Sequence, residues 1–344
     1  MVTLDLNKVG RIDAELVKGI SAEMVPPIMP DDQPTDNVYH YTSIDGLKAI
    51  LENRRLRFTH ISYMNDREEV IAGAEQFRKM GLARCDNELA SILATEAQNI
   101  EEGEPQVYVC CFSLKQDDLA MWNYYTKNPQ SQGYNIAFDY RELVIGILRA
   151  NPELHGCKFY FGLVDYRNDE GYASEVYRQS VWGLKNAMSS LVDAIRKLVP
   201  AKGVEEKSMK EVLAEEEVCV PVVKYYGDKP EFKKQPSLSA IYFMKRPCFA
   251  SEAEFRIVIE VTQEALEKLK TAKWKKYQFR SANGALIPYL ELDFDLNSMK
   301  GIKLSPTITS DLAAKGVREY CSYCGISPDN LADGITQSEI PVRF

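Results

Sequence analysis

The chain has 344 residues, of which 45% are hydrophobic and 27% are charged, and its formal net charge at pH 7 is −8. These values are typical of an ordinary globular protein, and the acidic balance argues against a protein that coats nucleic acid, although it allows a local basic groove. Because no apolar run approaches the roughly 20 residues of a membrane span and the chain starts with polar residues, we expect a cytoplasmic protein without membrane contact.

Residues 1–37 are expected to form an N-terminal arm. The stretch from Ile12 to Met24 has the pattern of a short helix. The closely spaced prolines from Pro26 to Pro34 cannot continue a helix, so they predict an extended linker. We expect residues 38–344 to form one domain.

A strand, a helix and a second strand are predicted over residues 38–60. Tyr39 and Tyr41 alternate with polar residues, as in a half-buried strand. Thr42 or Ser43 can cap the following helix, because both side chains carry a hydroxyl that accepts hydrogen bonds from main-chain N–H groups. The apolar stripe of this helix consists of Leu47, Ile50 and Leu51.

The rest of the domain mixes helices and short strands without regular alternation. Further helices are predicted at about 67–81, 85–101, 119–125, 139–150, 263–272 and 311–324. Further strands are predicted at about 107–113, 134–138, 157–166, 251–260, 289–294 and 302–304. Residues 174–220 are expected to form a helical insertion packed on the sheet. Because strands and helices do not alternate regularly, the pattern favours an α+β fold over a doubly wound one.

The usual catalytic signatures do not occur in the sequence. It contains no phosphate-binding glycine-rich loop, no Gly-x-Ser-x-Gly elbow and no His-Glu-x-x-His motif. Cys321 and Cys324 have a metal-like spacing, but a tetrahedral zinc site needs four ligands, and no second pair lies near them. We therefore expect no metal cofactor.

Two carboxylates and one guanidinium occur at alternate positions in the predicted strand 251–260. Residues two apart on a strand project to the same face, so Glu252, Glu254 and Arg256 are expected to lie together. Two close carboxylates repel each other unless a cation or substrate hydroxyls relieve the repulsion, and Arg256 can supply that charge. A solvent-exposed strand face with a Glu–Arg pair is the alternative interpretation.

Several motifs together resemble a bacterial family known only as a domain of unknown function, over roughly residues 38–262. They are His40-Tyr41-Thr42-Ser43, Asn65-Asp66 with Glu69, Cys111-Phe112-Ser113, Met121-Trp122 with Tyr125, Gly133 before a strand ending in Phe138-Asp139, and Glu252 with Glu254 and Arg256. That family is in turn similar to ADP-ribosyltransferases. The resemblance implies an ADP-ribosyltransferase-like split sheet, mixed or antiparallel, with flanking helices and a helical insertion.

The resemblance also implies an NAD-dependent ADP-ribosyltransferase, for which NAD is the substrate. Glu254 would stabilise the oxocarbenium-like transition state, and Glu252 would orient or deprotonate the acceptor. Ser113 would hold nicotinamide together with Trp122 or Tyr125. The residues implied to bind NAD are His40, Tyr41, Thr42, Ser113, Trp122, Tyr125 and Arg256.

Other functions remain open at this point. The same scaffold fits an NAD glycohydrolase, or a binding module without catalysis that recognises a nucleotide or a protein. The acceptor is expected to be a protein or a nucleic acid; in the latter case Lys48, Arg54, Arg55 and Arg57 would contact phosphates, although these residues can equally form a solvated helix end. A toxin or phage-defence effector with a partner or antitoxin protein fits this chemistry. On the residues alone, His40 can also be purely structural.

Overall fold

The computed structural model describes most of the predicted domain. The residues described are 37–64, 106–126, 132–154, 157–164, 166, 242–243, 245–282 and 284–341, with the backbone of three short strands at 2–3, 21–24 and 223–224. The helices predicted at 67–81 and 85–101 and the helical insertion at 174–220 lie outside this set.

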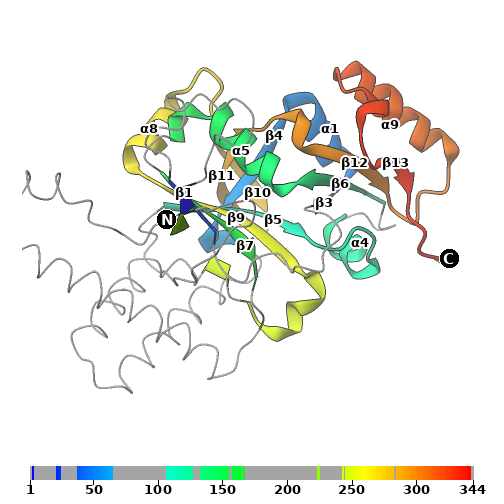
Figure 1. Cartoon of the computed structure of the whole chain (residues 1–344), viewed down its shortest axis with the longest axis horizontal. Coiled ribbons are helices and arrows are strands. Elements are labelled where there is room, and N and C mark those ends of the chain that lie inside the picture. The colour runs from blue at the N-terminus through cyan, green and yellow to red at the C-terminus, as the bar shows by residue number, and fades with distance from the viewer. Residues whose placement is uncertain are drawn as a thin grey trace, which may run out of the picture.

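One sheet forms the centre of the described chain, and most of its strand pairs are antiparallel (Figure 1). Its thirteen described strands are β1 (Val2–Thr3), β2 (Ser21–Met24), β3 (Asn37–Thr42), β4 (Arg55–His60), β5 (Gln106–Ser113), β6 (Tyr134–Asp139), β7 (Lys158–Leu163), β8 (Val223–Lys224), β9 (Glu254–Val261), β10 (Tyr277–Ala282), β11 (Ala285–Asp293), β12 (Met299–Leu304) and β13 (Gly334–Gln337). A large, mostly antiparallel sheet with several helices is compatible with the predicted α+β class.

The sheet divides at β5. One edge of β5 pairs with β9 along its whole length. The other edge pairs with β3 at Ser113 and with β4 at Tyr108 and Val109. One branch therefore continues from β3 through β6 and β12 to β13, and the other from β4 through β11 to β10. β5 is the strand that holds both branches together.

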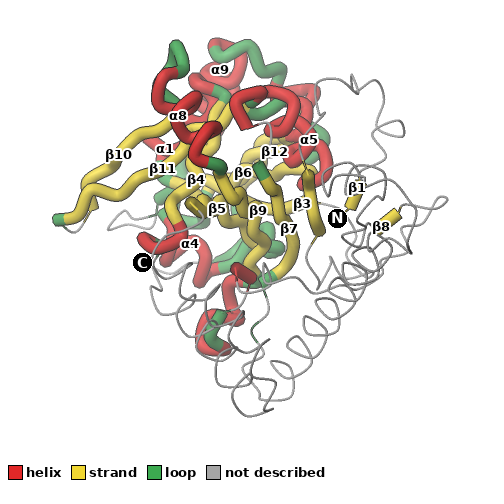
Figure 2. The backbone as a smooth tube through the Cα atoms, turned by 90° about the vertical axis from the view of Figure 1, so that its left-hand side faces the viewer, coloured by secondary structure: helices red, strands yellow, loops and turns green. Residues whose placement is uncertain are grey.

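The helices cover the two faces of the sheet unequally. They are α1 (Ile44–Asn53), α4 (Leu119–Tyr125), α5 (Tyr140–Ala150), α8 (Gln263–Thr271) and α9 (Asp311–Tyr323), with short 3₁₀ turns η1 (Ile61–Tyr63), η2 (Pro152–Leu154), η4 (Pro247–Glu252), η5 (Leu296–Ser298) and η6 (Pro328–Asn330). Figure 2 shows α4 on the side of the sheet opposite α8 and α9. The buried stripes of α1, α5, α8 and α9 all belong to one hydrophobic core, whereas Met121 and Trp122 of α4 belong to a separate cluster with Tyr39 and Tyr41.

Side-chain caps explain where two helices begin. The Ser43 hydroxyl accepts a hydrogen bond from the Gly46 N–H at 3.2 Å and so caps α1, as expected. The Asp118 carboxylate accepts from two main-chain N–H groups at the start of α4. α1 ends at Asn53, and the left-handed φ of 54° at the following Arg54 turns the chain directly into β4.

Three details of the predicted elements are wrong. Residues 21–24, predicted as the end of a helix, form β2, because their backbone pairs in parallel with β7 and this tertiary contact outweighs local preference. The described part of the arm thus belongs to the sheet. The strand predicted from residue 251 begins at Glu254. β1, β8, β10 and β13 were not predicted.

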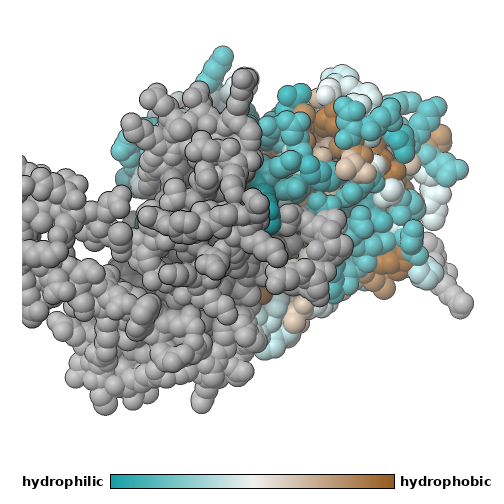
Figure 3. Space-filling view, viewed as in Figure 1, coloured by the Kyte–Doolittle hydropathy of each residue, from teal (hydrophilic) through white to brown (hydrophobic). Residues whose placement is uncertain are grey.

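Polar side chains cover much of the described surface visible in Figure 3, with smaller hydrophobic areas between them. Within the part of the chain that the structure describes, no helix is long and apolar enough to cross a membrane. Among the residues that the structure describes, the exposed large hydrophobic side chains are Ile44, Tyr63, Leu119, Tyr124, Trp274, Phe279, Leu286, Leu312 and Tyr323.

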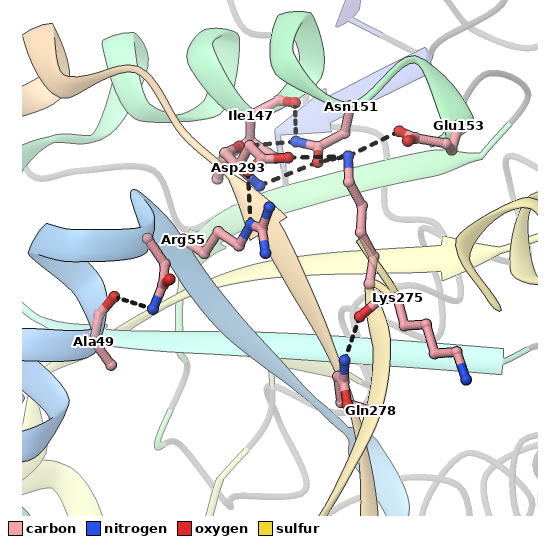
Figure 4. A network of polar contacts seen from close by, with 10 residues as sticks. Ala49, Arg55, Ile147, Asn151, Glu153, Lys275, Gln278 and Asp293 are labelled. Atoms are coloured by element: carbon pink, nitrogen blue, oxygen red, sulfur yellow. Dashed lines mark hydrogen bonds and ion pairs between the residues drawn. The ribbon is translucent and has the colours of Figure 1, made fainter. Parts of the chain in front are cut away.

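A buried polar network joins the end of α5 to the end of β11 and to Lys276, the residue before β10 (Figure 4). Asn151 is fully buried and donates to the main-chain oxygens of Ile147 and Asp293 at 2.7 and 2.8 Å. Its side-chain oxygen accepts from the Lys276 ammonium at 2.9 Å. The same ammonium contacts the carboxylates of Glu153 and Asp293, each at 3.0 Å. Every member therefore has a partner, which is the condition for such a network to stabilise a fold.

Replacing Asn151 with alanine is expected to lower the free energy of unfolding by about 2 kcal/mol, because it removes the buried hydrogen bonds of the Asn151 amide to two main-chain oxygens and to the Lys276 ammonium. Urea denaturation measures this change. The matched control is Asn53→Ala, since Asn53 is exposed and its amide donates to the Ala49 main-chain oxygen. Equal losses in the two variants would contradict a special role for the buried network.

Candidate functional site

The register of β5 and β9 places the candidate residues of these strands on one face of the sheet. Ser113 pairs with Glu254, and Cys111 pairs with Arg256. Side chains at directly paired positions project to the same side, and residues two apart on a strand do so as well. All four therefore lie on the face that carries α4, away from the main hydrophobic core.

The Glu254 carboxylate is held by two cations. Arg256 contacts it in a bidentate manner, with Nε at 2.9 Å from Oε1 and a terminal nitrogen at 3.0 Å from Oε2. The Lys245 ammonium lies 3.0 Å from Oε2. Glu254 is 4% exposed and Arg256 is 2% exposed, so the group is almost entirely removed from water. The prediction that Glu254 and Arg256 share a face is confirmed.

Glu252 reaches the same cluster from outside the strand. It is the last residue of η4, and Ala253 follows it with a left-handed φ of 43° before β9 begins. The expectation that Glu252 lies on the strand is therefore wrong, because this turn breaks the alternation. Its carboxylate nevertheless lies 2.8 Å from the Lys245 ammonium, which thus bridges Glu252 and Glu254.

Burial and charge act in opposite directions on Glu254. Burial by itself raises the pKa of the carboxyl, but the neighbouring Arg256 and Lys245 charges and their hydrogen bonds outweigh it and lower the pKa to about 2. Burial raises the pKa of the Tyr125 hydroxyl, and the charges of Glu252 and Glu254 raise it further. The carboxylate of Glu254 is thus ionised at neutral pH beside a protonated phenol.

Burial likewise raises the pKa of the Cys111 thiol well above its ordinary value, and the nearby Glu254 carboxylate adds to this effect. A thiol in this state is protonated at neutral pH and is a poor nucleophile. The Cys111 side chain is therefore a neutral neighbour of the carboxylate.

Ser113 joins the two strands at their paired ends. Its hydroxyl donates to the main-chain oxygen of Glu252 at 2.6 Å and accepts from the Lys115 N–H at 3.1 Å. The residue is fully buried. In this structure the hydroxyl fixes the turn that presents Glu252 and Glu254.

The aromatic residues of the candidate site occupy different environments. Trp122 is fully buried; its indole N–H donates to Asp117 at 2.8 Å, and its ring lies edge-on to Tyr41 at 4.7 Å. The Tyr41 hydroxyl donates to the Lys115 main-chain oxygen at 2.8 Å. Tyr125 is only partly buried and lies close enough to Glu252 and Glu254 for their charges to affect it. Of the two aromatics predicted to hold nicotinamide, Tyr125 is the one beside the carboxylates.

His40 and Thr42 do not share the face of Glu254. Tyr39 pairs with Ser113 across β3 and β5, so the alternating residues His40 and Thr42 project to the opposite side. The His40 ring accordingly lies against Phe112, at 5.6 Å between ring centres, and its Nδ1 is 3.1 Å from the main-chain oxygen of Cys111. Burial lowers the pKa of this imidazole. The sequence correctly predicted that β3, β5 and β9 lie close together, but it could not predict to which face of the sheet His40 and Thr42 project.

No known protein family, curated protein or solved structure matches this chain. The candidate site therefore rests on the contacts of its own residues. Asn65, Asp66 and Glu69, which belong to the motifs of the resemblance, lie outside the described residues.

Sequence reasoning missed three residues of the cluster. The Lys245 ammonium bridges both glutamates, Tyr242 accepts from Arg256 through its main-chain oxygen at 2.7 Å, and the Tyr166 hydroxyl accepts from the Glu254 N–H at 2.8 Å. Its position in the sequence, shortly before Pro247, Glu252 and Glu254, was the signal that could have indicated Lys245 as part of the cluster. Among the residues that the structure describes, no group of three metal-binding side chains is found.

The basic cluster considered for phosphate binding is largely engaged within the protein. Arg55 pairs with Asp293 at 2.8 Å, and Arg57 pairs with Glu291 at 3.0 Å. Arg54 donates to the main-chain oxygen of Cys324. Lys48 is exposed on α1. These contacts favour the alternative interpretation, in which the cluster at the end of α1 and in β4 is not a phosphate contact.

Proposed function

We propose that this chain cleaves the bond between nicotinamide and ribose in NAD and transfers ADP-ribose to a macromolecular acceptor. The observation that carries the proposal is the Glu254 carboxylate, ionised and rigidly held beside Tyr125. As nicotinamide leaves, positive charge develops at ribose C1′. A fixed carboxylate stabilises that charge without reorganising during the reaction, so catalysis needs no acid to protonate the leaving group.

The two cations beside Glu254 have different roles in the proposed site. Arg256 binds the carboxylate through a planar fork and is itself fixed by the Tyr242 main-chain oxygen. Lys245 carries a compact charge on a flexible chain, so it is the partner that a substrate ribose would displace. Glu252, released from the same ammonium, would then orient or deprotonate the acceptor.

Tyr125 is the proposed nicotinamide contact, because its ring is partly exposed next to the carboxylates. Trp122 and Tyr41 support α4 from within the protein, and Ser113 fixes the position of Glu252. His40 and Thr42 have no role in the proposed site, since their side chains lie on the other face of the sheet. An NAD glycohydrolase would use the same residues with water as the acceptor.

Release of nicotinamide from NAD by the purified chain tests the proposal. Glu254→Gln is expected to abolish release, because the amide removes the charge and keeps the shape. Glu260→Gln is the matched control: Glu260 projects to the same face of β9 and contacts the Tyr242 hydroxyl and Lys158. Circular dichroism verifies that both variants are folded. Equal release by the wild type and Glu254→Gln would refute the catalytic assignment.

The second candidate function is a binding module without catalysis. It is favoured by the near-complete burial of Glu254, whose charge is already balanced by Lys245 and Arg256. This function predicts that NAD raises the unfolding temperature of the chain without any release of nicotinamide. Measuring both quantities on one sample distinguishes the two candidates.

A further inference from the structure

The β10–β11 hairpin extends away from the rest of the described chain, as Figure 2 shows. The segment that enters it reads Lys273-Trp274-Lys275-Lys276-Tyr277-Gln278-Phe279-Arg280, so cations and aromatic rings are interleaved. The structure keeps most of these groups at the surface. Trp274 is 64% exposed and Phe279 is 53% exposed. Contact with water does not stabilise an indole or phenyl ring, so the exposure of two such rings at one place requires an explanation.

Two of the aromatic rings lie together on one side of β10. Tyr277 and Phe279 project from the same side of β10 and contact each other edge-on, with 5.1 Å between ring centres. The Lys270 ammonium lies 5.5 Å from the centre of the Tyr277 ring. Trp274 follows α8 in the short segment that leads into this strand.

The charges of this segment are unequally compensated. Lys268 and Lys270 of α8 pair with Glu264 and Glu267, and Lys276 belongs to the buried network described above. Lys273 and Lys275 are exposed, and in the described part of the chain neither forms an ion pair. The patch is therefore locally cationic on a chain whose net charge is −8.

We propose that this hairpin surface binds single-stranded nucleic acid, with bases stacked on Trp274 and Phe279 and phosphates contacting Lys273 and Lys275. Rings with free faces beside unpaired cations provide the two interactions that such strands require, stacking and backbone neutralisation. An acidic protein partner could pair with the lysines, but it would leave the aromatic rings exposed to water. This binding is independent of the proposed reaction with NAD.

Fluorescence anisotropy with labelled oligo(U) and oligo(dT), each of about 20 nucleotides, tests the proposal on the full chain. Neutralising about two phosphates predicts roughly 7-fold weaker binding at about 200 mM salt than at about 50 mM. Trp274→Ala and Phe279→Ala are each expected to weaken binding roughly 10-fold. The double variant Lys273→Glu, Lys275→Glu is expected to abolish most of the salt dependence. A preference between the two oligonucleotides would distinguish RNA from DNA as the ligand.

Tyr323→Ala and Lys315→Glu on α9 are matched controls, because both side chains are exposed far along the chain from the hairpin. They are expected to bind like the wild type. Wild-type affinity in the Trp274 and Phe279 variants, together with equal binding of polyglutamate or duplex DNA, would show a general charge effect and overturn the proposal. Self-association of the wild type that these variants abolish, without oligonucleotide binding, would overturn it as well.

Discussion

Replacing Arg256 with methionine is expected to lower the free energy of unfolding by about 3–5 kcal/mol. The guanidinium supplies both hydrogen bonds of the bidentate contact to Glu254, and a third to the Tyr242 main-chain oxygen. Methionine preserves part of the volume but leaves the Glu254 carboxylate buried with Lys245 as its remaining cation. The penalty is mainly the cost of holding an under-compensated charge away from water.

Urea denaturation at neutral pH measures this loss. Arg57→Met is the matched control, since Arg57 forms a comparable Glu–Arg contact across two strands but its side chain is 54% exposed. We expect that control to cost less than about 1 kcal/mol. The double variant Arg256→Met, Glu254→Leu should recover much of the loss, because neither partner is then left charged. A loss below about 1 kcal/mol in Arg256→Met would mean that the buried pair is not stabilised as its geometry indicates.

Acidification is expected to remove on the order of 3 kcal/mol of stability through Glu254 alone. The pKa of this carboxyl is about 2 in the folded chain, against an ordinary value of 4.5. Between these values the unfolded chain binds the proton more readily than the folded chain. The contribution is therefore fully present above the ordinary pKa and is lost as the pH falls toward the folded value.

The difference in unfolding free energy between the wild type and Glu254→Gln isolates this effect, because other titrating groups contribute equally to both chains. The difference is expected to shrink as the pH falls from about 6 to about 3. Burial also lowers the pKa of His40 and His60, so their contribution to stability is lost as the pH falls below the ordinary imidazole pKa of 6.5, but this loss is common to both chains and does not change the difference between them. A difference that stays constant over the acidic range would contradict the depressed pKa of Glu254.

Local sequence signals predicted local structure well. The Ser43 cap, the apolar stripe of α1 and the continuous apolar run of β5 each depend on neighbouring residues, and the structure contains all three. The hairpin of β10 and β11 was missed, although Tyr277 to Arg280 alternate apolar and polar side chains and part of β11 was predicted as a strand. The dipeptide Asn283-Gly284 between the strands is a strong hairpin signal that could have revealed it.

The candidate site depended on contacts between distant segments, and here prediction was limited. The spacing of Glu254 and Arg256 predicted a shared face correctly, since it needs only one strand. The face of His40 depends on the register between β3 and β5, and a shift of one residue would reverse it. Lys245 was missed because only the left-handed turn at Ala253 brings both glutamates to its ammonium.

The division of the sheet at β5 also bears on how the chain is synthesised and folded. β3, β4 and β5 leave the ribosome well before β9, which later covers one whole edge of β5. At ordinary rates of translation that edge stays without its partner for on the order of ten seconds. Pairing segments so far apart in sequence slows folding and exposes an apolar strand to other chains. We expect the yield of folded protein to depend on temperature and on chaperones during synthesis.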